Sequence, residues 1–301
     1  MERLLGKIEG TLPGPLIICL AAIHGNEQFG IHAFRNVYSA ILNHKIPFCG
    51  KLVGIIGNEK AVQSNRRFID YDLNRCWTES HIEELLGGKN SKAEDNELLA
   101  IHRMIKEESQ GNYTMRVLSD LHATSSDKGN FIVVPEELGS HPIIQALQLP
   151  VALDLHKYLD GTLLSYYSEK GYLSFAMEGG QIGTSEVYRL HTSGLWEILE
   201  KAGAISQHDH EHEDHYANHL KEVSENLPSK VKVLYRHLVR PEDGFRMLPG
   251  FHNFQKIHKG QQLAIDARGN IVSPHDGMIF MPLYQNEGED GFFVVEEISK
   301  P

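Results

Sequence analysis

The chain has 301 residues, of which 41% are hydrophobic and 23% charged, and its formal net charge is -11. This length predicts one large domain with a smaller one appended to it. No apolar run approaches the roughly 18 residues that a membrane span needs, and the N-terminus MERLLGKIEG lacks the pattern of a secretory signal. We therefore expect a soluble cytoplasmic protein that has no membrane partner.

Charge and cysteine content exclude further classes of protein. The acidic balance opposes nonspecific binding to nucleic acid, which needs clustered Lys and Arg. Cys19, Cys49 and Cys76 are odd in number and lie outside any CxxC pair, which argues against a disulfide framework and a thiolate zinc site. We expect no nucleic-acid partner, and an anionic substrate would need a locally positive pocket.

The N-terminal part of the chain shows the pattern of an α/β unit. Leu16–Ala22 (LIICLAA) is a nearly continuous apolar run, typical of a strand buried on both faces. A polar turn follows, and apolar residues then recur at helical spacing from about Phe29 to Asn43. Lys51–Gly57 (KLVGIIG) is the next predicted strand.

Strand-like and helix-like segments continue to alternate up to residue 202. The pattern predicts helices over Glu94–Lys106, around Ile143–Tyr158 and over Thr184–Ala202. It predicts strands over Arg116–Leu121, Phe131–Val134 and Tyr172–Met177. This alternation indicates an α/β fold with a mixed sheet and helices on both of its faces.

The residue composition and the pattern of apolar segments change after residue 203. His208–His219 (HDHEHEDHYANH) is typical of a solvated linker between domains, although its i,i+4 histidines leave a metal-handling role open. Val231–Glu297 holds short alternating segments broken by Gly, Pro, Asn and Asp, which predicts a β-rich region. We place the two domains at residues 1–224 and 225–301.

Polar and metal-competent residues follow several of the predicted strands. In open α/β sheets ligands bind beyond the carboxyl ends of the strands. The residues at such positions are His24, Glu27, Asn74, Arg75, His122 and Glu178. A catalytic zinc site uses three N or O ligands and keeps one position open, a count that His24, Glu27 and His122 would meet.

Four short motifs carry a resemblance to a known family. They are HGNE (24–27), RRFIDYDLNR (66–75), DLHAT (120–124) and MEGG (177–180), in that order. In these motifs the chain resembles the succinylglutamate desuccinylase/aspartoacylase family, within the wider zinc carboxypeptidase group. The resemblance spans most of residues 15–200, and the tail after residue 225 is similar in character to that family's C-terminal domain.

The resemblance implies a role for each matching residue. One zinc ion per chain would be held by His24, Glu27 and His122. Glu178 would take a proton from water and pass it to the leaving amine, while Arg67 polarises the scissile carbonyl. The residues expected to bind a substrate carboxylate are Asn74 and Arg75.

The implied function is hydrolysis of the amide bond of an N-acyl amino acid or a similar small anionic amide. An alternative keeps the chemistry but acts on peptides, as a carboxypeptidase- or amidase-like enzyme. A third interpretation is a non-catalytic zinc-binding or regulatory protein, against which the open fourth position of a three-ligand site argues. The oligomeric state stays open, a homo-oligomer included.

The chain departs from the family's pattern at two places. Ser168 stands where the aspartoacylase branch has an arginine, ten residues before Glu178, and Arg66 or Lys170 are candidate substitutes. The family's C-terminal tyrosine has no clear counterpart in NEGEDGFF (286–293). The candidate replacements are Tyr284, Tyr166 and Tyr167.

Three aspartates near these motifs have two open interpretations. Asp70 and Asp72 are candidates for orienting the arginines, and Asp120 lies two residues before His122, on the same face of a strand. The alternative is that all three are solvated carboxylates at loops and strand ends.

Overall fold

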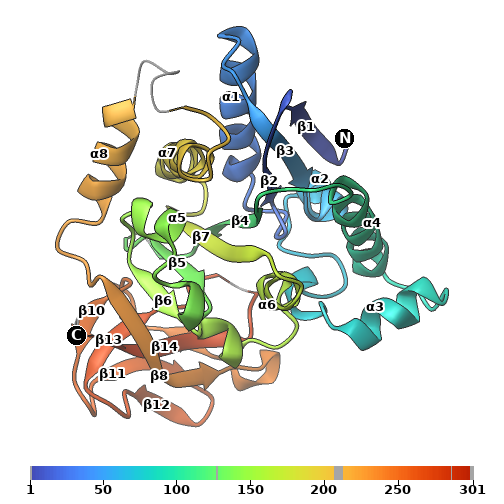
Figure 1. Cartoon of the computed structure of the whole chain (residues 1–301). Coiled ribbons are helices and arrows are strands. Elements are labelled where there is room, and N and C mark those ends of the chain that lie inside the picture. The colour runs from blue at the N-terminus through green and yellow to red at the C-terminus, as the bar shows by residue number, and fades with distance from the viewer. Residues whose placement is uncertain (1, 127, 207–212, 286, 299–301) are drawn as a thin grey trace.

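A large mixed sheet organises the molecule (Figure 1). The computed structural model describes residues 2–126, 128–206, 213–285 and 287–298. The sheet has 11 strands in the order β1-β3-β2-β4-β7-β5-β6-β8-β14-β13-β10. Their bounds are β1 Leu4–Glu9, β2 Leu12–Ala21, β3 Cys49–Ile56, β4 Arg116–Thr124, β5 Phe131–Val134, β6 Val151–Leu153, β7 Leu173–Gln181, β8 Lys230–Leu238, β10 Gln255–Ile257, β13 Gly277–Phe280 and β14 Asp290–Glu297.

The centre of the sheet is parallel, and its strands are buried on both faces. β2 pairs in parallel with β3 and β4, and β4 pairs in parallel with β7. β5 then runs antiparallel to β7, so the sheet is mixed, as predicted. Because neighbouring residues of β2 face opposite sides, the apolar run of that strand contributes to the cores on both faces.

Helices cover both faces of this sheet (Figure 1). α1 Phe29–Asn43 and α7 Ser185–Lys201 pack against each other and share a core with Ile17, Cys19 and Ala21. The opposite face has α3 Glu79–Leu86, α4 Ala93–Glu108 and α6 Leu163–Glu169. The predicted two-sided α/β architecture is confirmed.

Shorter helices connect these elements. They are α2 Glu59–Ser64, α5 Pro142–Ala146, α8 Glu213–Val223 and the 3-10 turns Leu73–Arg75, Glu136–Leu138, Leu155–Tyr158 and Pro241–Asp243. Within the described ranges, no helix has both the length and the apolar character needed to cross a membrane.

The C-terminal region is rich in strands, as predicted, and it extends the large sheet. β8 pairs with β6 and β14, which joins the region to the centre of the molecule. A separate three-stranded sheet packs beside it, made of β9 Arg246–Met247, β11 Gln262–Asp266 and β12 Gly269–Val272. The boundary at residues 224 and 225 falls between α8 and β8 and stays a prediction.

Two local predictions are wrong. The stretch 143–158 is only partly helical, because β6 lies between α5 and a 3-10 turn. Residues 213–219 are not a solvated linker but belong to α8, where His219 is buried against Ser193 and Glu186 of α7. His208 and His212 lie outside the described residues.

Candidate metal centre and catalytic site

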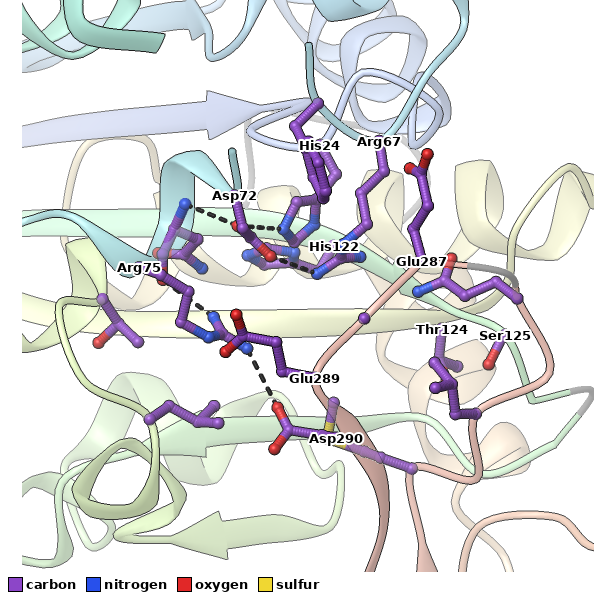
Figure 2. Close-up of a pocket in the computed structure, with 18 of the residues that line it drawn as sticks. His24, Arg67, Asp72, Arg75, His122, Thr124, Ser125, Glu287, Glu289 and Asp290 are labelled. Atoms are coloured by element: carbon purple, nitrogen blue, oxygen red, sulfur yellow. Dashed lines mark hydrogen bonds and ion pairs between the residues drawn. The ribbon is translucent and has the colours of Figure 1, made fainter. Parts of the chain in front are cut away.

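The three predicted metal ligands meet at the carboxyl ends of β2 and β4, and Figure 2 shows two of them, His24 and His122, beside each other. His24, Glu27 and His122 are each only 4% exposed, and their ligand atoms lie within 4.8 Å of one another. Nδ1 of His24 is 2.8 Å from one oxygen of Glu27, and Nδ1 of His122 is 3.2 Å from the other. Two imidazoles therefore face one carboxylate from two sides.

The HGNE turn places two of these side chains. The backbone N–H of Glu27 donates to the carbonyl of His24, and that of Gly25 donates to the carbonyl of Arg67. A Cβ at Gly25 would come within 2.1 Å of the backbone of Ala61, so only glycine fits at this contact. The turn therefore holds His24 and Glu27 on one side and anchors the loop of Arg67.

Carboxylates hold the far side of both histidines. Nε2 of His122 lies 2.7 Å from Asp120, and Nε2 of His24 lies 3.2 Å from Asp72. A neutral imidazole that donates from Nε2 has only a lone pair at Nδ1. The Nδ1 lone pairs of both histidines would then face the carboxylate of Glu27 at short distance and repel it, unless protons or a cation lie between them. These three groups therefore suit a bound cation.

The pKa values of Glu27 and His122 are shifted in the directions that favour their charged forms. Burial alone would raise the pKa of Glu27, but the neighbouring charges of His24 and His122 outweigh burial and lower it. Burial alone would lower the pKa of His122, but the charge of Asp120 raises it well above its usual range. The raised pKa of His122 thus favours a proton on this residue in the metal-free cluster, and a bound metal ion would displace that proton.

Glu178 lies directly beside the cluster. It is the residue of β7 that pairs with His122 of β4 in the parallel register. Its side chain is 7% exposed, lines the cavity and forms no hydrogen bond or ion pair with the described residues. Burial raises its pKa to about 7, with a further contribution from the charge of Glu27. A carboxyl group with this pKa can both accept and donate a proton near neutral pH.

Arg67 completes the wall beside the cluster. Its Nη2 donates to Asp72 at 2.9 Å, and its Nη1 lies 3.5 Å from Glu27. Burial alone would raise the pKa of Asp72, but the charge of Arg67 outweighs it and holds that pKa well below its usual range. Nε of Arg67 is buried without a partner among the described atoms, so the guanidinium keeps a free donor.

The loop that carries Arg67 is fixed by a residue that the sequence interpretation missed. Glu94, at the start of α4, is fully buried, and it accepts hydrogen bonds from the backbone N–H groups of Ile69 and Asp70. It also accepts from Asn58. An acidic residue in the first turn of a helix is common, so the sequence contained no signal for this role.

Asn74 and Arg75 line the cavity farther from the cluster. The side-chain oxygen of Asn74 accepts from the backbone N–H of Leu163, which leaves its amide N–H₂ as a donor. Arg75 donates to the backbone of Asn74 and, at 3.3 Å, to Asp290. Its Nε has no partner among the described atoms. The two residues therefore present N–H donors that suit a carboxylate.

The three aspartates of the sequence interpretation have different roles. Asp72 orients Arg67 and His24, and Asp120 supports His122. Asp70 forms no hydrogen bond or ion pair with an arginine of the described residues, and it accepts from the backbone N–H of Ala93 at the start of α4. Two of the three therefore act in the site, and the third stabilises the scaffold.

Arg66 and Lys170, the candidate substitutes for the arginine that Ser168 replaces, are not among the residues that line the cavity. Arg66 is half exposed and points to Glu287, 4.0 Å away. Lys170 pairs with Glu79 on the surface, and Ser168 lies on α6 away from the lining residues. The structure thus gives neither cation a contact with the cavity.

The candidate tyrosines also point elsewhere. The hydroxyl of Tyr284 bonds to the backbone of Phe251 and Leu248. Tyr166 and Tyr167 pack in an aromatic cluster with Trp77. None of the three lines the cavity within the part of the chain that the structure describes.

The site opens into a cavity of about 600 Å³. Its inner wall is formed by the strand ends, and its outer wall by C-terminal residues within 239–245, 281–285 and 287–290. This is the size of a typical small-molecule site.

Comparison with known proteins identifies the family. The model of the succinylglutamate desuccinylase/aspartoacylase catalytic domain matches residues 13–191, which is more than half of the chain. The chain belongs to this family, and the membership supports a deacylase role.

Individual relatives extend the similarity over most of the chain. A probable aspartoacylase of Prochlorococcus marinus (strain NATL1A) is 24% identical over 288 residues, covering 90% of this chain and 87% of that protein. A succinylglutamate desuccinylase of Ectopseudomonas mendocina is 25% identical over 299 residues, covering 92% and 83%. The crystal structure of a succinylglutamate desuccinylase/aspartoacylase from Rhodobacter sphaeroides has a TM-score of 0.69 at 14% identity, covering 97% and 88%. That last likeness is one of fold.

Proposed function

We propose that this protein is a zinc-dependent hydrolase that cleaves the amide bond of an N-acyl amino acid or a similar small anionic amide. One observation carries the proposal: two imidazoles and a carboxylate face one another beside an unpaired buried carboxyl group. That arrangement is made by His24, Glu27, His122 and Glu178. The names of the family's relatives agree with the reaction class.

The donor set suits one zinc ion per chain. Zinc accepts imidazole nitrogen and carboxylate oxygen, and three protein ligands leave a position open, as in catalytic sites. When bound, zinc supplies Lewis acidity, which lowers the pKa of water and polarises a carbonyl group. The hydrogen bonds of Asp120 and Asp72 orient His122 and His24 for binding through Nδ1.

Glu178 and Arg67 perform the proton transfer and charge stabilisation. Glu178 accepts a proton from the attacking water, whose oxygen forms the new bond to the acyl carbon. Arg67 donates a hydrogen bond to the carbonyl oxygen as negative charge develops there. When the C–N bond breaks, Glu178 returns its proton to the leaving nitrogen, so the products are a carboxylate and a free amine.

The shape of the cavity favours a small substrate. Arg75 and Asn74 both line the cavity, and we assign them the binding of the carboxylate of the amine half. C-terminal segments form the outer wall of a cavity of about 600 Å³, a volume typical of a small-molecule site. We accordingly propose a small molecule as the partner, in preference to a peptide, a nucleic acid or a membrane.

A matched pair of variants tests this proposal. The zinc-loaded wild type is assayed for amine release on a panel of N-acetyl and N-succinyl amino acids and short peptides, beside Glu178→Gln. We expect hydrolysis of N-acyl amino acids by the wild type and a loss of about 10²–10⁴-fold in kcat for Glu178→Gln at unchanged zinc content. Glu225→Gln, a surface control outside the cavity, should keep full activity.

Equal rates for the wild type and Glu178→Gln would overturn the proposed mechanism. Hydrolysis of peptides alone would replace the N-acyl amino acid by the peptide as substrate. Zinc binding without hydrolysis of any panel member would overturn the proposed function.

A further inference from the structure

The helix α7 approaches the strand β7 closely, on the face of the sheet opposite to the side chain of Glu178. Neighbouring residues of a strand face opposite sides, so Glu178 lines the cavity whereas Met177 belongs to the core that includes α7. A Cβ at Gly194 of α7 would come within 2.6 Å of the Sδ of Met177. The missing side chain at Gly194 therefore lets the helix lie near the backbone of the strand end that carries Glu178.

His191, one turn before Gly194 on α7, reaches that backbone. Its side chain is buried at 1% exposure, and its Nε2 lies 3.1 Å from the carbonyl oxygen of Met177. A Cβ at Gly179 would come within 2.7 Å of the same Nε2, so the imidazole occupies the space that a side chain at Gly179 would need. His191 thus contacts the residues on both sides of Glu178.

The imidazole of His191 is neutral and has a defined tautomer. Burial lowers the pKa of His191 to about 4, and the hydrogen bond to the backbone of Met177 offsets only part of this effect. A neutral imidazole has one N–H, and the carbonyl acceptor at Met177 assigns it to Nε2, so Nδ1 carries a lone pair. That Nδ1 is buried without a hydrogen-bond partner among the described atoms.

Packing alone does not explain a histidine at this position. A buried acceptor without a partner costs stability, and an apolar side chain of similar size would fill the same space without that cost. What the imidazole adds is the Nε2 donor. This donor acts on the peptide group that joins Met177 to Glu178.

Glu178 depends on its backbone for the position of its carboxyl group. Its side chain forms no hydrogen bond or ion pair with the described residues. The pairing of β4 with β7 also changes register directly after the pair His122 and Glu178, so the regular ladder is interrupted there. A further contact that fixes this peptide group therefore decides where the carboxyl group lies relative to His122.

We infer that His191 is a positioning residue for the proposed general base. Its hydrogen bond to Met177 and its contact with Gly179 fix the backbone of Glu178, and thereby hold the carboxyl group beside the metal centre. This inference rests on the proposed function and adds a residue to that same site. His191 is not among the residues that line the cavity, so its effect belongs to kcat and not to the binding of zinc or substrate.

Two substitutions at His191 separate the hydrogen bond from packing. His191→Gln keeps an N–H donor near the position of Nε2, whereas His191→Leu has a similar volume and no donor. Thr192→Val is the matched control, because it removes a hydrogen bond to the carbonyl of Tyr188 within the same helix and lies outside the cavity lining. Zinc content, kcat and KM are measured for the zinc-loaded proteins on an N-acyl amino acid that the wild type hydrolyses.

We expect His191→Leu to lower kcat by about 10- to 100-fold at unchanged KM and zinc content, because a misplaced base slows the reaction without weakening binding. His191→Gln should keep most of the wild-type kcat, and Thr192→Val should keep all of it. In the background of Glu178→Gln, His191→Leu should cause no further loss, because His191 acts through Glu178.

Gly179→Ala tests the same contact from the strand, and it replaces His191→Leu if that variant does not fold. Because the added Cβ would lie 2.7 Å from Nε2 of His191, either the ring or the strand must shift. We expect the same result, a lower kcat at unchanged KM and zinc content.

Four results would overturn the inference and leave the amide hydrolase intact. They are an unchanged kcat in His191→Leu, an equal loss of kcat in His191→Gln and His191→Leu, a loss of zinc from His191→Leu, and a further loss of kcat when His191→Leu is added to Glu178→Gln. No hydrolysis of any N-acyl amino acid by the wild type would instead overturn the proposed function on which the inference rests.

Discussion

The inner wall and the outer wall of the same cavity are built in different ways. On the inner wall, His24, Glu27 and His122 are almost fully buried, and carboxylates behind both imidazoles hold their orientation. On the outer wall, Glu289 is exposed, and its side chain forms no hydrogen bond or ion pair with the described residues. The groups proposed to bind the metal and move the proton thus lie on a buried, hydrogen-bonded scaffold of strand ends, whereas the outer wall carries exposed charge.

The largest effect should come from the inner wall. We expect His122→Ala to lose zinc and to lower kcat/KM by at least about 10³-fold, because the two remaining ligands cannot complete the site. Zinc content by atomic spectroscopy and amide hydrolysis check this. The matched control on the outer wall, Glu287→Gln, should keep its zinc. Loss of zinc from the control, or retention of zinc in His122→Ala, would contradict this prediction.

A smaller effect should come from the carboxylate behind the metal centre. Asp120→Asn should weaken zinc affinity by about 10- to 100-fold, because the amide holds the His122 ring less firmly in the binding orientation. Competition with a zinc-binding dye measures the affinity. Asp160→Asn, an exposed site outside the cavity, is the control, and equal affinities in all three proteins would show that Asp120 does not support the centre.

The smallest effect should appear in the stability of the metal-free protein. Burial raises the pKa of Glu178 from 4.5 to about 7, so the folded state holds a proton that the unfolded chain releases. Stability is therefore lost as pH rises from about 4.5 to about 7. Glutamine cannot ionise, so the free energy of unfolding of Glu178→Gln should not fall over this pH range. We expect it to exceed that of the wild type by about 1–3 kcal/mol at pH ~8 and by little at pH ~4.

Urea denaturation of both metal-free proteins at the two pH values measures this gain. Glu225→Gln should show no such dependence on pH, because its side chain is exposed. If Glu178→Gln differed from the wild type equally at both values, the buried carboxyl would not ionise as proposed, and burial would not set the inner wall apart from the exposed outer wall.

Much of the fold was predictable because its segments are strongly periodic. The helix over Phe29–Asn43 has the predicted bounds, and the strand before it starts four residues earlier than expected. The prediction failed where a three-residue strand, β6, is shorter than a recognisable pattern. It also failed at α8, because the charged composition of this segment predicts a solvated linker and gives no sign that His219 contacts α7.

The candidate site was predictable in part for a similar reason. Residues that follow parallel strands gather at one edge of the sheet, so the meeting of His24, Glu27, His122 and Glu178 could be inferred from their order. Their roles as ligands and base stay proposals. The support from Glu94 could not be inferred, because it depends on how α4 packs against the loop of Arg67.

By itself, the sequence determined the α/β architecture, the family and the set of groups able to hold a metal and move a proton. Each of these follows from local periodicity or from short motifs, which are properties of neighbouring residues. Only the tertiary structure decided which charges face the substrate. Arg75 and Asp290 are far apart in the chain, and they meet because β14 continues the sheet that begins at the N-terminus. The balance of charge in the cavity is thus a property of the folded sheet and not of any one segment.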